Sequence, residues 1–205
     1  MGRRVIVTLL SRGHRVRALV REGSQGRLPE GCEAVVGNAL DDRTFASSVP
    51  PADTFLQLVG VAHPSPAKAA EFRAVDLASA KASAWAAAGA GVSHFVYVSV
   101  AQPAPVMKAY VEARAEGEAA IRVAGLNATF VRPWYVLGPG HRWPYFFLPV
   151  YWLLQLLPPS RDTARRLYPV TLNQMIATLV AAVEAPAPGV RIVETPEIRR
   201  TRLEE

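Results

Sequence analysis

Three side chains in the middle of the chain have types and a spacing that suit proton transfer. Ser99 ends a compact apolar run, and Tyr110 stands four residues before Arg114. Residues four apart lie on the same face of a helix, so the phenol and the guanidinium would be neighbours there. A tyrosine phenol can act as an acid or a base, and a neighbouring cation supplies a positive field. Tyr110 and Arg114 are therefore candidates for one shared site, and Ser99 ends the apolar run that precedes them.

The elements that must position these residues follow from the apolar pattern. Helical spacing, alanine-rich segments and glycines near predicted ends indicate helices, whereas short apolar runs between turn residues indicate strands. We expect helices over 2–10, 67–88, 107–124 and 172–185, and strands over 16–20, 34–36, 54–61, 94–99, 128–131 and 190–193. The apolar stretch from Tyr145 to Leu157 predicts a buried or lid helix, and the charged tail from Glu197 is expected to fray.

Strands and helices alternate along most of the chain, at spacings that suit right-handed crossovers. This order predicts a doubly wound α/β fold whose parallel sheet is covered on both faces. Because the chain opens inside a helix, we expect the sheet to lack its first strand. No repeat or linker divides the chain, so we expect one domain, 1–205.

Ligands of such sheets bind beyond the carboxyl ends of the strands. Arg21 directly follows the predicted strand 16–20, at a position where an acidic residue binds the ribose of NAD. A guanidinium pairs with phosphate through two hydrogen bonds, so Arg21 favours NADP, with Ser24 and Arg17 as helpers. NAD is the second choice, and a solvated arginine at a strand end is the simpler alternative.

Several segments, in chain order, resemble the extended and atypical branches of the short-chain dehydrogenase/reductase superfamily. Gly2 resembles the last glycine of that family's phosphate-binding turn. Gly37-Asn38-Ala39-Leu40-Asp41 resembles its Gly-Asp-x-x-Asp segment along the adenine, with Asn38 replacing an aspartate. The run from Arg132 to Gly140 resembles its Arg-Pro-x-x-Val-Tyr-Gly-Pro-Gly segment, which is the most specific match. The resemblance covers nearly the whole chain and implies a Rossmann-type fold.

The resemblance also implies roles for individual residues. Ser99 would hold the substrate oxygen, Tyr110 would act as acid/base, and Arg114 would stand where the family has a lysine that lowers the tyrosine pKa and holds the ribose. Arginine has a different shape and reach, so Tyr110 and Arg114 could instead only line a bound cofactor. Residues 1–135 would form the cofactor core and 136–205 the substrate side. The implied cofactor contacts are Gly2, Arg21, Asn38, Ala39, Val59, Gly60, Val61, Pro133 and Val136.

Two functions are possible, and a third interpretation is a remnant that has lost cofactor binding. The first is an NADP-dependent oxidoreductase or epimerase acting on a carbonyl or hydroxyl substrate. The second is a non-catalytic dinucleotide-binding protein that resembles the NmrA-like redox sensors or the NADPH-holding accessory subunit of respiratory complex I. Ser99 and Tyr110 favour the first, whereas Arg114 favours the second.

Composition argues against several other classes. The net charge of +6 is scattered among apolar segments without a nucleic-acid-binding motif, so no nucleic acid is expected. The histidines show no metal-ligand spacing, and no metal is expected. No apolar stretch has the length needed to span a bilayer, and no signal peptide is expected. The single cysteine, Cys32, fits a reducing compartment, so we expect the cytoplasm. A group of aromatic side chains predicts helix packing, an apolar pocket or shallow membrane contact: Trp143, Tyr145, Phe146, Tyr151 and Trp152.

Overall fold

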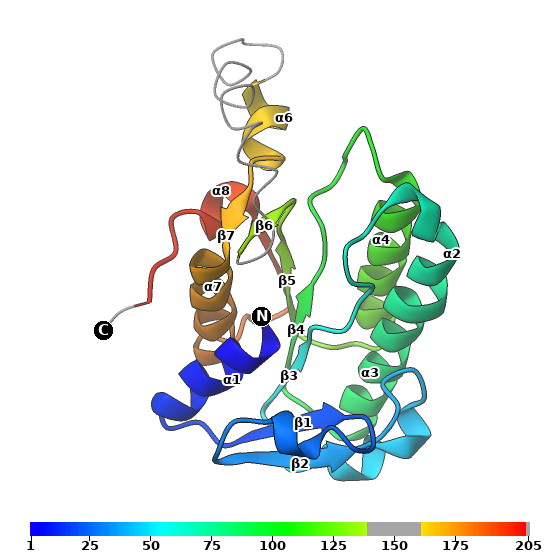
Figure 1. Ribbon diagram of the computed structural model, residues 1–205, viewed down its shortest axis with the longest axis vertical. Coiled ribbons are helices and arrows are strands. Elements are labelled where there is room, and N and C mark those ends of the chain that lie inside the picture. Colours follow the sequence, from blue (N-terminus) through cyan, green and yellow to red (C-terminus); the bar gives the residue numbers. More distant parts are fainter. Residues whose placement is uncertain (139–160, 204–205) are drawn as a thin grey trace.

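The computed structural model describes residues 1–138 and 161–203, and its paired strands run parallel (Figure 1). β1 pairs with β2, four strands form a larger sheet in the order β3-β4-β5-β8, and β6 pairs with β7. The predicted α/β class with a parallel sheet is confirmed. The strands are β1 Val16–Val20, β2 Cys32–Val36, β3 Thr54–Gln57, β4 His94–Val98, β5 Ala128–Arg132, β6 Val136–Leu137, β7 Val170–Thr171 and β8 Val190–Glu194.

Helices cover both faces of the larger sheet. Helices α1 and α7 lie on one face, and α3 and α4 lie on the other (Figure 1). The α-helices are α1 Gly2–Ser11, α2 Ala69–Glu71, α3 Ala78–Gly89, α4 Lys108–Val123, α6 Arg161–Arg166, α7 Leu172–Glu184 and α8 Thr195–Ile198. A π-helical segment, η5 Phe72–Leu77, joins α2 to α3.

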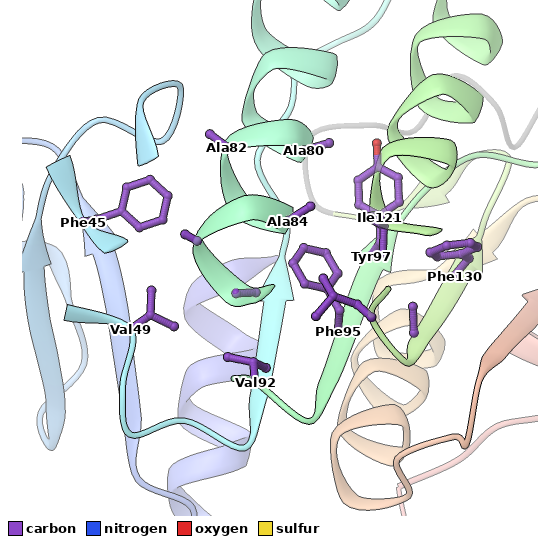
Figure 2. Packing of buried hydrophobic residues seen from close by; sticks show 14 residues of the cluster. Phe45, Val49, Ala80, Ala82, Ala84, Val92, Phe95, Tyr97, Ile121 and Phe130 are labelled. Atoms are coloured by element: carbon purple, nitrogen blue, oxygen red, sulfur yellow. The ribbon is translucent and has the colours of Figure 1, made fainter. Parts of the chain in front are cut away.

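The apolar run of β4 is explained by its position between the two helix layers. Phe95 and Tyr97 pack among small side chains of α3, as Figure 2 shows, whereas Val96 and Val98 belong to the cluster that includes α1 and α7. Successive side chains of a strand point to opposite faces. A strand buried on both faces therefore needs a continuous apolar sequence.

The helix predicted over 67–88 is divided into α2, η5 and α3, and the strand predicted over 34–36 begins at Cys32. Two further predicted boundaries are wrong. The strand predicted over 54–61 ends at Gln57, because the Gln57 side chain accepts the N–H of Val59 at 3.1 Å and the N–H of Val61 turns to a carboxylate. The tail from Glu197 does not fray at once, since α8 includes Glu197 and buries Ile198 completely.

Three other predicted helices are confirmed, and one prediction lies outside the described residues. The predicted helices over 2–10, 107–124 and 172–185 are confirmed to within one residue as α1, α4 and α7. The predicted helix from Tyr145 to Leu157, and the aromatic group around it, lie outside the described residues. Within the described ranges, no helix has the length and apolar character needed to cross a membrane.

Candidate active site

The candidate catalytic residues lie where β4 ends and α4 begins. Ser99 follows the last residue of β4, is only 2% exposed, and donates its backbone N–H to the carbonyl of Val131 at 2.8 Å. Its hydroxyl has no hydrogen-bond partner among the described residues. A buried hydroxyl without a partner is costly, so Ser99 Oγ keeps an unused capacity for a hydrogen bond.

Tyr110 stands in the first turn of α4, one helical turn before Arg114. Its ring packs against Phe72 of η5, with centroids 5.0 Å apart, and the Arg114 Cζ lies 5.3 Å from the Tyr110 centroid. The predicted i and i+4 neighbours therefore meet as a cation–π pair. Burial raises the pKa of Tyr110, while the positive charge of Arg114 acts to lower it.

The guanidinium of Arg114 is buried and held by two groups. It forms an ion pair with Asp76 of η5, with 2.6 Å between Nη2 and Oδ1, and it donates from Nη1 to the carbonyl of Val98 at 2.7 Å. The other Asp76 oxygen accepts the N–H of Val61 at 3.1 Å. Burial raises the pKa of Asp76, whereas Arg114 and the Val61 N–H lower it. The pair thus joins the end of β3, η5, the end of β4 and α4.

Sequence reasoning missed Asp76, although one signal was available. An aspartate flanked by Val75 and Leu77 within a long alanine-rich helix is an acidic group in an apolar segment. Acidic side chains are almost never fully buried unless they are paired, so Asp76 needed a cationic partner. The sequence did not indicate which of the many arginines that partner would be.

Gly60 leaves room for this ion pair. A Cβ on Gly60 would lie 2.1 Å from Nη2 of Arg114 and 2.8 Å from Oδ1 of Asp76. We predicted Gly60 as a cofactor contact, and its surroundings supply a second reason for a glycine. Its neighbours differ in exposure, since Val59 is 38% exposed and Val61 is half-buried.

The predicted adenosine-binding residues follow β1 and β2. Arg21 is exposed at the carboxyl end of β1, and Ala39 is half-buried beyond β2. The side-chain oxygen of Asn38 accepts the N–H of Leu40 at 3.1 Å, so it stabilises its own turn. Arg17, the predicted helper, donates to the carbonyls of Ser48, Pro50 and Pro51 and so holds that loop.

The segment after β5 is held by a second network of charges. Arg132 binds Glu118 of α4 through two hydrogen bonds of 2.6 and 2.8 Å, and it also contacts Glu194 at 3.2 Å. The next residue, Pro133, is buried and accepts the N–H of Ala101 at 2.9 Å. Val136 lies further on, in β6. The last residues of the motif, from Pro139, lie outside the described residues.

The fold and site define a class, the doubly wound α/β proteins that bind dinucleotides at the carboxyl ends of parallel strands. Residues 1–141 match the NAD(P)H-binding family, and the chain belongs to that family. A ceramide reductase of Caulobacter vibrioides is 28% identical over 203 residues, which are 98% of this chain and 62% of that protein. The chain thus spans less than two thirds of the length of this relative.

Solved structures share the fold at lower identity. The Bordetella bronchiseptica enzyme WbmH, in complex with NAD+, matches with a TM-score of 0.66 and 16% identity over 93% of this chain and 70% of that one. A UDP-galactose 4-epimerase matches with a TM-score of 0.67 and 17% identity over 94% and 73% of the two chains. A short-chain dehydrogenase/reductase superfamily protein of Agrobacterium tumefaciens with bound NAD matches with a TM-score of 0.66 and 18% identity over 94% and 74%. These structures confirm the predicted Rossmann-type fold.

The residues at the strand ends fit such a cofactor in most respects. Helix α1 begins at Gly2, where a Cβ would lie 3.9 Å from Leu58, just beyond β3. The first N–H groups of a helix have no partner within it and attract phosphate. Arg21 adds an exposed cation, and Ser99 adds the orphaned hydroxyl. Arg114 differs from the other predicted contacts because its guanidinium is already bound to Asp76 and to the carbonyl of Val98.

Proposed function

We propose that this chain is the cofactor-binding part of an NADP(H)-dependent oxidoreductase that reduces a carbonyl group to a hydroxyl. The observation that carries the proposal is the orphaned hydroxyl of Ser99 next to a strand end that Arg114 binds, with Tyr110 stacked on the same guanidinium. Membership of the NAD(P)H-binding family and the similarity to a reductase support it.

The chemistry assigned to the chain is binding and proton transfer. Ser99 donates a hydrogen bond to the substrate carbonyl oxygen and orients it. NADPH, when bound, supplies the hydride that reduces the carbonyl carbon. Tyr110 donates its phenolic proton to the substrate oxygen as negative charge develops there, and Arg114 stabilises the phenolate that remains. The proposed cofactor contacts, besides Arg21, are Gly2, Asn38, Ala39, Val59, Gly60, Val61, Pro133 and Val136.

Turnover by matched variants tests this proposal. The purified protein is mixed with NADPH and a panel of carbonyl compounds, including carbonyl-bearing analogues of ceramide, and the loss of NADPH fluorescence is followed. We expect Ser99→Ala and Tyr110→Phe to lose about 10²-fold or more in turnover while NADPH binding persists. Ser83→Ala is the control, because Ser83 is equally buried but lies in α3. Full turnover by Tyr110→Phe would refute the assigned mechanism.

The choice of NADP over NAD rests on Arg21. Arg21→Ala should weaken NADPH binding much more than NADH binding, since only NADPH carries the 2′-phosphate. Arg15→Ala is the control, because Arg15 is exposed just before β1 whereas Arg21 is exposed just after it. Equal losses for both cofactors, or tighter binding of NADH by the unaltered protein, would contradict NADP specificity.

The engagement of Arg114 by Asp76 favours a second candidate function, a non-catalytic NADPH-binding sensor or accessory protein. In that case NADPH binds tightly, no carbonyl compound is reduced, and Tyr110→Phe leaves NADPH binding unchanged. We place either protein in the cytoplasm because its one cysteine, Cys32, is free.

A further inference from the structure

We propose that Asp76 is a positioning residue that, by binding Arg114, places Tyr110 and the strand end at Ser99 relative to each other. The proposal rests on the function proposed above, and it adds a residue to which no role has been assigned. Asp76 does not itself act on substrate. It works through the guanidinium that it holds.

The first support is the way in which the ion pair is enclosed. Asp76 is completely buried and Arg114 is 5% exposed, so water does not screen their attraction. The two Asp76 oxygens bind different parts of the protein, since Oδ1 contacts Arg114 and Oδ2 accepts the N–H of Val61. The absent side chain of Gly60 provides the space. The carboxylate is therefore fixed by the backbone that follows β3.

The second support is what the guanidinium reaches once it is held. Nη1 of Arg114 binds the carbonyl of Val98, the residue directly before Ser99. The same guanidinium lies over the ring of Tyr110, at 5.3 Å, and near that of Tyr97, at 5.7 Å. One cation thus contacts the backbone next to the proposed oxygen-binding hydroxyl and the ring of the proposed acid.

The third support is the local helix geometry. Asp76 lies in η5, where the helix widens to π geometry between α2 and α3. π-Helical segments are rare in proteins, and those that occur are often found at functional sites. Phe72, four residues before Asp76, packs on Tyr110 from the same segment. The widened turn therefore supplies two side chains to the tyrosine environment.

The charges that face Tyr110 give the proposal a distinct signature. Arg114 on α4 acts to lower the pKa of Tyr110 and Asp76 on η5 acts to raise it, in addition to the dominant effect of burial. Tyr97 of β4 faces the same guanidinium. The other ion pair between η5 and α4, Arg73 with Glu116, is largely exposed. Asp76 thus moderates the effect of Arg114 on the phenol.

The test is the titration of Tyr110 in Asp76→Asn, which removes the charge and keeps the shape. Tyrosines carrying a ¹³C label at Cζ are followed by NMR against pH without cofactor, and Tyr110→Phe assigns the signal. We expect Tyr110 to titrate at lower pH in Asp76→Asn than in the unaltered protein, because Arg114 then acts alone. Glu116→Gln, which removes a carboxylate from the exposed pair, should leave the titration unchanged.

An unchanged titration in Asp76→Asn, or an equal shift in Glu116→Gln, would overturn the proposal. If Asp76→Asn does not fold, Asp76→Leu combined with Arg114→Met removes both buried charges. Tyr110 should then titrate at higher pH than in the unaltered protein, and an unchanged value would also overturn the proposal. Neither result depends on turnover, so a failure of the proposed oxidoreductase activity is recognised separately.

Discussion

Replacing Gly60 with alanine should break the buried ion pair between Asp76 and Arg114. The new Cβ would lie 2.1 Å from Nη2 of Arg114, far inside van der Waals contact. The guanidinium is the end of a long side chain and can move, but movement separates it from Asp76 and from the Val98 carbonyl. Disrupting a buried ion pair costs about 3–5 kcal/mol. For a chain of this size, each kcal/mol lowers the melting temperature by about 2–4 °C.

Thermal and urea unfolding, followed by circular dichroism, measure this loss in the absence of cofactor. We expect Gly60→Ala to melt about 6–20 °C below the unaltered protein. Gly89→Ala is the matched control, because Gly89 ends α3 and a Cβ there has nothing within 4 Å. A loss no larger than that of Gly89→Ala would refute the steric argument. Gly60 would then be explained better as a contact for the cofactor alone, with an effect confined to NADPH binding.

Two further predictions concern charges that fasten the helices. Glu118→Ala should lower the free energy of unfolding in urea by about 3 kcal/mol, because it leaves Arg132, whose side chain is 14% exposed, without its main partner. Glu112→Ala, an exposed change on the same helix, is the control and should lower it far less. The hydrogen bond from Arg12 lowers the pKa of Glu184, so this carboxylate stabilises the fold above the ordinary glutamate pKa and loses that contribution as pH falls through its lowered value. Glu184→Gln should therefore be less stable at pH 7 by under about 1 kcal/mol, since the pair is about one third exposed, and the difference should vanish in acid; a difference that persists at the acid end of the titration would contradict this assignment.

The sequence alone predicted most individual helices and strands, because each is indicated by residues that are close together in the chain. The apolar and aromatic run of β4 predicts a compact strand, and the spacing of Tyr110 and Arg114 predicts a shared helix face. Both predictions hold in the structure. The Arg-Pro segment after β5 indicated the family for the same reason, since its signal lies in consecutive residues.

Tertiary structure alone decided where Arg114 points. The sequence placed it beside Tyr110 but left open whether its guanidinium would face a cofactor ribose or the protein interior. Its partner, Asp76, lies in a different helical segment, and Gly60, which makes room for both, follows a third element. A buried charge is satisfied by whichever opposite charge the packing brings within reach, and that depends on the relative positions of β3, η5 and α4. The same dependence gave Gly60 its steric role and brought the N–H of Val61 to the Asp76 carboxylate.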